Sequence, residues 1–137
     1  MATLDTLIRL AKEHVDEARQ EVSKRELLVS KIKQQQAELT AQMQTEAESV
    51  RGDPQQQSDY AAYYQAALKR QHSLAKALQM AEAQVLEARD ILRDCFAEQK
   101  RYEIALENQK AEAKLAAERL ERQVFDEQAA VRWQREE

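Results

Sequence analysis

The chain has a single glycine and a single proline among 137 residues, and both lie in the run Arg51-Gly52-Asp53-Pro54. Glycine and proline are the two residue types that are least favourable in the interior of a helix, so the sequence predicts a break between helices at this run alone. Elsewhere Ala, Gln, Glu, Leu, Lys and Arg dominate, and all of them favour helix. A sheet would need repeated turn residues and β-branched or aromatic strands. We therefore predict an all-α fold of two helices.

The chemistry of this run predicts where the helices end. Gly52 suits the C′ position after a helix, and Pro54 disfavours a helical conformation at the residue before it. The second helix can begin with Asp53 as its cap, Pro54 at N1 and Gln56 at N3, or only with Ser58 as the cap after an irregular stretch. We place the first helix at 3–51, the turn at 52–58 and the second helix at 59–136, in one domain of residues 1–137.

Apolar residues recur on both sides of the turn at alternating spacings of three and four, which is the heptad pattern of a coiled coil. Three polar residues interrupt the first stripe: Arg25, Gln36 and Glu46. The first stripe has Leu4, Ile8, Ala11, Val15, Ala18, Val22, Val29, Ile32, Leu39, Met43 and Val50, and the second has Tyr60, Tyr64, Ala67, Leu74, Leu78, Ala81, Val85, Ala88, Leu92, Cys95, Tyr102 and Leu106. The pattern predicts an antiparallel two-helix coiled-coil hairpin.

Two registers of this hairpin are compatible with the pattern. In the one that we prefer, the numbers of facing residues add up to 110, so that large side chains mostly face small ones; in a register slipped by one heptad they add up to 103. Polar residues at seam positions either fix such a register or only lie at an exposed edge. Arg25, Gln36, Gln71 and Gln99 are the candidates for this role.

The two arms are unequal, because the turn lies well before the middle of the chain. Residues from about 107 to 137 have no partner in the first helix and project about 45 Å beyond it as a longer C-terminal helix. An apolar stripe that leaves the strict heptad continues there, with Phe125 and Trp133 to its side. The stripe residues are Ala113, Ala117, Leu120, Val124 and Val131. We interpret this projecting helix as a docking element.

The composition argues against several kinds of chemistry. One glycine is too few for a phosphate-binding loop, and His14 and His72 lie too far apart to share a metal ion. Cys95 is expected to pack in the seam, and paired carboxylates are expected on solvated faces. We therefore predict no catalytic residue, no cofactor and no metal site.

Charge and hydropathy indicate which partners to expect. The net charge of -4 arises from interleaved acidic and basic residues, which disfavours nucleic acid as a partner. No apolar run is long enough to span a bilayer, and the first residues do not have the pattern of a signal peptide. We expect a cytoplasmic protein without direct membrane insertion.

Three tyrosines lie close to the turn. The heptad places Tyr60 and Tyr64 in the seam and Tyr63 on its flank. They either close the end of the coiled coil or form an exposed contact site, since tyrosine is enriched at the centre of protein interfaces.

Three stretches resemble the flagellar export protein FliJ family: LDTLIRLAKE at 4–13, EQKRYE at 98–103 and AERLERQVFDEQA at 117–129. The pair Asp126-Glu127, followed by Ala129, Ala130 and Arg132, is the most specific of these signs. The resemblance covers the whole chain. It implies a non-enzymatic stalk and adaptor of the type III export apparatus, similar in shape to the coiled coil of the rotary ATP synthase gamma subunit.

The resemblance also implies partners. The terminal end would enter the hexameric export ATPase FliI, and the rest would face the export gate FlhA at the inner membrane; FliH and export chaperones are further candidates. We assign ATPase binding to Leu120, Val124, Asp126, Glu127 and Arg132, and gate binding to Tyr60, Tyr63 and Tyr64. The stalk of a virulence injectisome, a homodimerising structural coiled coil and an export chaperone are the alternatives.

Overall fold

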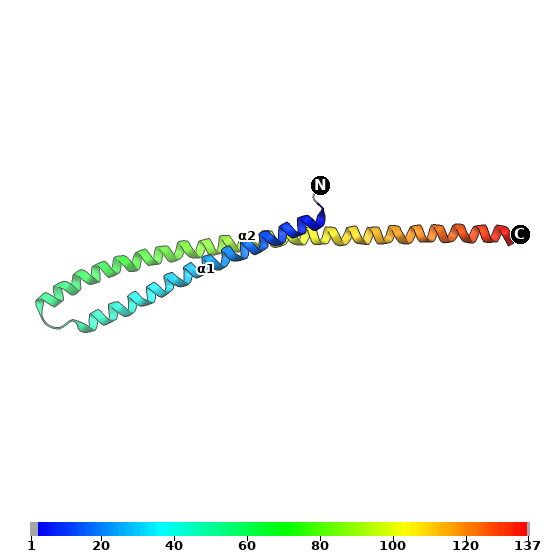
Figure 1. Ribbon diagram of the computed structural model, residues 1–137. Coiled ribbons are helices and arrows are strands. Elements are labelled where there is room, and N and C mark those ends of the chain that lie inside the picture. The colour runs from blue at the N-terminus through cyan, green and yellow to red at the C-terminus, as the bar shows by residue number, and fades with distance from the viewer. Residues whose placement is uncertain (1–2, 137) are drawn as a thin grey trace. The chain divides into compact units, whose positions relative to one another are not determined.

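A computed structural model describes residues 3–136 and confirms the all-α prediction. Helix α1 runs over Leu4–Ser49 and helix α2 over Pro54–Glu136, and no strand occurs in this part of the chain. Residues 50–53 join the two helices (Figure 1). Among the described residues, neither helix contains an apolar stretch that is long enough to cross a membrane.

Helix α1 begins at a threonine cap. The Thr6 N–H donates to Oγ1 of Thr3 over 3.2 Å, and the Leu7 N–H donates to the Thr3 carbonyl over 3.0 Å. The side-chain bond satisfies one of the backbone donors that a helix leaves open at its start, and the bond to the carbonyl is the first regular bond of the helix. Asp5 adds an acidic side chain in the first turn, where the helix dipole favours it.

The connection at 50–53 is shorter than the expected turn at 52–58, because α1 ends at Ser49 and not at residue 51, and α2 begins at Pro54 and not at residue 59. Asp53 is the cap: its Oδ1 accepts from the Gln55 N–H over 3.1 Å, and its carbonyl accepts from the Gln57 N–H over 3.1 Å. Gln56 reaches back, and its Oε1 accepts from the Arg51 N–H over 3.3 Å. The cap with proline at N1 therefore prevails over a start at Ser58.

Gly52 does not have the left-handed conformation expected at a C′ position. No residue of the described chain, glycine included, has a positive φ. A Cβ built on Gly52 would meet nothing within 4 Å. Helix α1 ends at Ser49, three residues before the glycine. Residues 50–53 then lead to α2 without a residue in the left-handed conformation.

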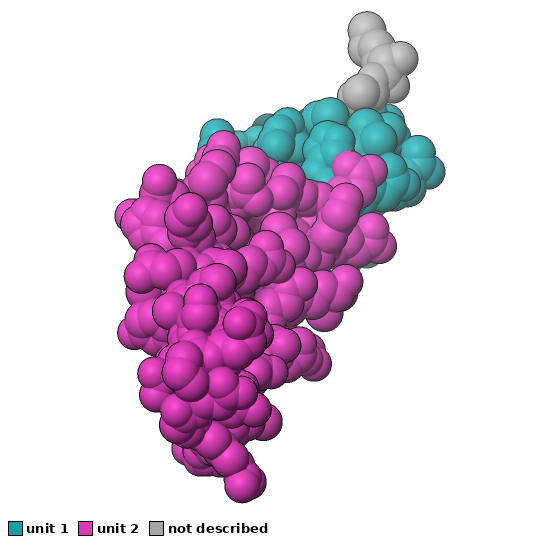
Figure 2. All heavy atoms as spheres, turned by 90° about the vertical axis from the view of Figure 1, so that its left-hand side faces the viewer, with its two compact units in different colours: residues 1–14, 95–137 teal, residues 15–94 magenta. Residues whose placement is uncertain are grey.

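The chain divides into two compact units (Figure 2). The hairpin unit contains residues 15–94, and the terminal unit contains 3–14 together with 95–136. In the hairpin unit α1 and α2 run antiparallel, and their heptad positions form the core. The buried residues there are Val15, Ala18, Ile32, Ala67, Leu74, Ala81, Val85 and Ala88.

The contacts of the hairpin unit fit the register in which facing residues add up to 110. Ile32, Leu74 and Ala81 form one buried cluster, against which Val29 and Leu78 pack. Nη1 of Arg25 donates to Oε1 of Gln84 over 2.8 Å, whereas the slipped register would place Arg25 opposite Leu78.

In the terminal unit the start of α1 is packed and the end of α2 is not. Ala11 is buried, and Leu4, Ile8, Cys95, Tyr102 and Leu106 are half-buried. Every residue from 107 to 136 is exposed. We call residues 107–136 the C-terminal segment; Glu137 lies outside the described residues.

Candidate functional site

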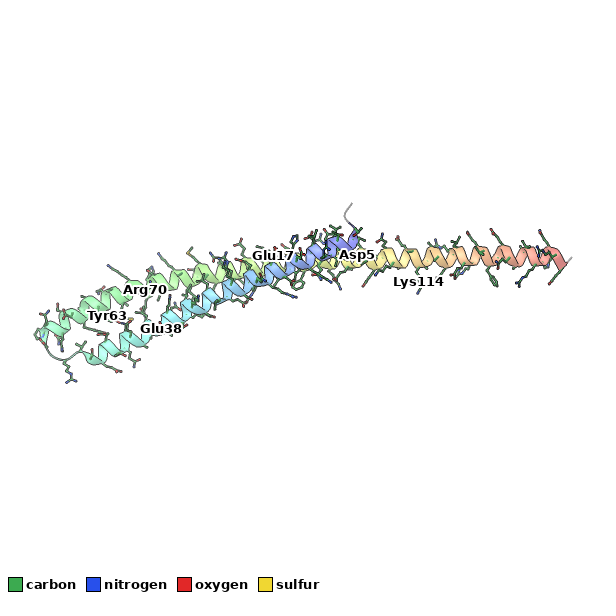
Figure 3. All side chains as sticks on the ribbon, in the orientation of Figure 1. Asp5, Glu17, Glu38, Tyr63, Arg70 and Lys114 are labelled. Carbon is green, nitrogen blue, oxygen red and sulfur yellow. The ribbon has the colours of Figure 1, made fainter. Side chains whose placement is uncertain are left out.

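The C-terminal segment is a regular helix, and no other helix of the terminal unit covers it (Figure 3). Its apolar side chains are exposed: Leu120 is 62% exposed, Phe125 71% and Trp133 65%. A helix normally covers its apolar residues with another element, because leaving them in water is unfavourable. This segment is therefore the largest candidate contact surface of the terminal unit.

The five residues predicted for ATPase binding do not share one face of this helix. At about 100° per residue, Leu120, Val124 and Glu127 lie within about 60° of each other. Val131 lies between them, and we call Leu120, Val124 and Val131 the leucine face. Asp126 and Arg132 lie about 120° to either side of Leu120. They flank the leucine face as an acidic and a basic side chain.

Sequence reasoning placed Phe125 and Trp133 only to the side of the stripe and left them out of the site. In the structure they flank Ala129 at successive turns of α2, and a hollow of about 250 Å³ lies there. We call Phe125, Ala129 and Trp133 the aromatic face. The hollow is lined by Phe125, Gln128, Ala129, Arg132, Trp133 and Glu136. Apolar residues outside the heptad positions were the signal for this face.

The second candidate site is the tyrosine group in the hairpin unit, and here one expectation was wrong. Tyr63 turns inward and is half-buried, whereas Tyr64 is 39% exposed. Tyr60 is half-buried, and its ring centroid lies 6.0 Å from that of Tyr64. The seam close to the turn thus takes Tyr60, Tyr63 and Ala67, because spacings of three and of four both keep side chains on one side of a helix, so Tyr63 can replace Tyr64 there.

The hydroxyl of Tyr63 is buried without a hydrogen-bond partner among the described residues. Burial, the carboxylate of Glu46 and the neighbouring Tyr60 all raise the pKa of the Tyr63 hydroxyl. Tyr63 lies on α2 near the turn (Figure 3), where a groove of about 330 Å³ opens. The groove is lined by Glu46, Ser49, Val50, Gln56, Asp59, Tyr60 and Tyr63.

Tyr64 leads into an exposed apolar flank that the heptad analysis missed. Leu68 follows it one turn later on α2 and is also exposed. A second groove, of about 530 Å³, runs beside Leu68 between the two helices. It is lined by Gln36, Thr40, Leu68, Gln71, His72 and Ala75. Tyr64 is thus the exposed residue among the three tyrosines predicted for gate binding, and Leu68 extends its surface.

The described residues contain no group of three or more His, Cys, Asp or Glu side chains that could hold a metal ion. Cys95 is a free, half-buried thiol at a seam position. Apart from Tyr63, a raised pKa is found for Tyr102, where the hydrogen bond that its hydroxyl donates to Glu98 over 3.0 Å is the main cause.

A comparison with protein families gives a match over the full length of the chain. The model of the family described as flagellar FliJ protein matches residues 1–137, the whole chain. No curated protein and no solved structure matches the chain significantly.

Proposed function

The chain belongs to the flagellar FliJ family and is thus a component of the flagellar export apparatus, and we propose that it acts there as a non-enzymatic stalk. The C-terminal segment would enter the central pore of the hexameric export ATPase FliI. The hairpin unit would face the export gate FlhA. This function places the protein in the cytoplasm, peripherally at the inner membrane.

The exposure of the whole C-terminal segment is the observation that supports the stalk proposal. A single helix with side chains is about 10–12 Å across, which is a suitable width for the pore of a protein ring. Leu120, Val124 and Val131 offer that pore an apolar surface that nothing in the terminal unit covers.

The asymmetry of the segment suggests how it would act on the ATPase. An effector shifts a conformational equilibrium only through contacts that differ between the states. A helix with the leucine face on one side, Asp126 on one flank and Arg132 on the other presents different chemistry to each subunit around it. It would thus favour different states in different subunits of a six-fold ring.

For the gate, we propose the flank that begins with Tyr64. Tyr64 and Leu68 are exposed, whereas Tyr60 and Tyr63 support the flank from within. FliH and export chaperones are further candidate partners for the remaining surface of the hairpin unit.

The stalk proposal is tested by pull-down of the cognate ATPase and by its rate of ATP hydrolysis. We expect the full chain to bind the ring and to raise hydrolysis, and Leu120→Asp with Val124→Asp to abolish both effects, because a carboxylate cannot enter an apolar contact without a large desolvation cost. Met80→Asp is the matched control, since Met80 is 66% exposed in the hairpin unit.

Two results would contradict the proposal. One is unchanged stimulation after removal of residues 107–137. The other is a stable homodimer of the chain that is lost on the same truncation, because the segment would then serve a second copy. Light scattering of the full chain and of the truncated chain gives their oligomeric states and so detects such a homodimer.

A further inference from the structure

The C-terminal segment has two apolar faces that lie nearly opposite each other. Relative to Leu120, the side chains of Phe125 and Trp133 are rotated by about 140° and about 220° around the helix. Ala129 lies between them, almost diametrically across from Leu120. Both aromatic side chains are more exposed than Val124 and Val131 on the leucine face.

Such an arrangement differs from that of an ordinary surface helix. A helix that packs against one neighbour has a single apolar stripe about 100° wide and a polar opposite face, whereas a helix with apolar residues all round is enclosed. One partner helix or one flat surface would cover the leucine face and leave Phe125 and Trp133 in water. A second copy of this chain, paired through one seam, would leave them uncovered as well.

The charges between the two faces are also mixed. Glu121 and Arg132 lie on one side and Arg119 and Asp126 on the other. Glu118 and Arg122 lie at about 160° and about 200° from Leu120, within the aromatic face, so no side of the helix has charges of one sign only. A nucleic acid or an anionic lipid surface requires a uniformly basic side. The segment instead fits protein walls with apolar contacts and scattered charges of both signs.

We propose that the aromatic face is a second contact surface and that the segment is bound by a partner that surrounds it. One subunit of a ring would contact the leucine face, and a different subunit would insert an apolar side chain between Phe125 and Trp133. Ala129 leaves room for this side chain, since its methyl group forms the floor of the hollow of about 250 Å³. This inference rests on the proposed stalk function and adds the surface on the opposite side of the helix.

Trp133 is the only tryptophan of the chain and therefore reports on this face alone. The experiment uses the full chain with 5-hydroxytryptophan at position 133, which absorbs beyond the range of ordinary tryptophan, and the unlabelled ATPase ring. We expect the emission to shift to shorter wavelength and quenching by acrylamide to fall severalfold on binding, because the side chain becomes buried.

Each outcome has a distinct meaning. Binding of the ring with Trp133 still accessible to acrylamide would overturn the second contact surface and leave the stalk proposal intact. Absence of binding would overturn the stalk proposal and this inference together. Protection that depends on the concentration of the chain alone would identify a second copy as the occupant and overturn the enclosing partner.

A pair of variants tests the energetic weight of the face. Phe125→Ala with Trp133→Ala is expected to weaken binding to the ring by about tenfold or more, as truncation of buried aromatic anchors does. Met80→Ala is expected to leave binding unchanged, although Met80 is as exposed as Trp133. Equal affinity of the double variant and the unmodified chain would overturn the proposal; both variants should keep their helical circular dichroism, since these side chains cover no core.

Discussion

Asp53 shows how much one side chain determines at the turn. Its carboxylate and its carbonyl each accept a backbone N–H of the first turn of α2 over 3.1 Å. Together with Pro54 at the first helical position, this capping sets the start of α2, and thereby the length of the connection from Ser49.

Replacement of Asp53 by alanine is expected to lower the free energy of unfolding by about 1 kcal/mol, because the N–H of Gln55 loses its acceptor. Asp59→Ala removes a carboxylate from the same end of α2 but from an exposed position inside the helix, and serves as the control. Urea denaturation followed by circular dichroism measures both. Equal stability of the two variants would show that the cap contributes nothing.

Tyr63 predicts a dependence of stability on alkaline pH. Its pKa is raised above the ordinary value of 10.0 in the folded hairpin, mainly by burial and next by Glu46. The folded state therefore holds this proton more tightly than the unfolded state. The resulting stability is fully present below about pH 10 and is lost as the pH rises through the folded pKa.

The measurement compares melting temperatures at about pH 8 and at about pH 11, on either side of the ordinary tyrosine pKa. Tyr63→Phe should be neutral or stabilising at the lower pH, because it removes a buried hydroxyl without a partner, and should lose less stability at the higher pH than the unmodified chain. Tyr64→Phe, on an exposed ring, controls for the loss of a hydroxyl. An equal alkaline loss in the unmodified chain and in Tyr63→Phe would contradict the prediction.

For single residues, only part of the structure could be predicted from the sequence. The cap at Asp53 was one of two readings, and no local rule distinguished it from a cap at Ser58. The inward side chain of Tyr63 could not be predicted, because a strict heptad assigns that inward position to Tyr64, whereas Tyr63 takes it in the structure while Tyr60 and Ala67 keep their heptad positions. Gly52 was expected to have a left-handed conformation directly after the helix. It does not, because α1 already ends at Ser49 and Gly52 has no positive φ.

At the scale of the elements, the polar layer around Arg25 is the feature that specifies how α1 and α2 pair in the hairpin unit. Nε of Arg25 donates to Glu21 over 2.8 Å and Nη1 to Gln84 over 2.8 Å, so one guanidinium joins both helices. Glu26 and Arg89 add an ion pair of 3.0 Å beside it. A slip by one heptad would break both cross-helix contacts.

Arg25→Leu is expected to raise the free energy of unfolding by about 1 kcal/mol, because a half-buried seam position gains an apolar side chain. The same change should relax the register and the oligomeric state, as removal of a polar seam residue does in coiled coils. Light scattering should then show dimers or larger species beside the monomer. A single species with an unchanged melting temperature would contradict this role.

The seam was the most predictable part of the fold. Nearly all apolar heptad positions of both helices are buried or half-buried, because a strict repeat leaves each helix only one stripe to cover. Of the four polar seam candidates, Arg25 forms a cross-helix bond, Gln99 donates to Glu103 within its own helix, Gln36 is half-buried and Gln71 is exposed. Spacing alone could not distinguish these cases, since they depend on which side chain lies opposite.

In the molecule as a whole, the hairpin unit has a buried core, whereas the C-terminal segment has no buried residue. Removal of residues 107–137 is therefore expected to change the free energy of unfolding by no more than about 0.5 kcal/mol and to change the melting temperature little. The reason is that none of the described residues that are removed covers the core. The helical circular dichroism should fall in proportion to the residues removed. A large loss of stability would show that the segment supports the hairpin.

The position of one glycine and one proline predicts that the residues from about 107 onward have no partner in the first helix, because helix lengths follow directly from the place of the break, and residues 107–136 are all exposed in the structure. The aromatic face was not predicted. A search for a single repeat finds one stripe, and Phe125 and Trp133 are recognised as a surface only when their angular positions around α2 are considered together.

The exposed C-terminal segment is also the part of an unassembled copy that we expect proteases to cleave first. Backbone hydrogen bonds that no tertiary contact protects open locally, independently of global unfolding, and proteases cleave such open stretches. A free copy would therefore be trimmed from this end first, while a copy whose segment is held by a partner would be spared. The amount of intact protein would then follow the amount of that partner.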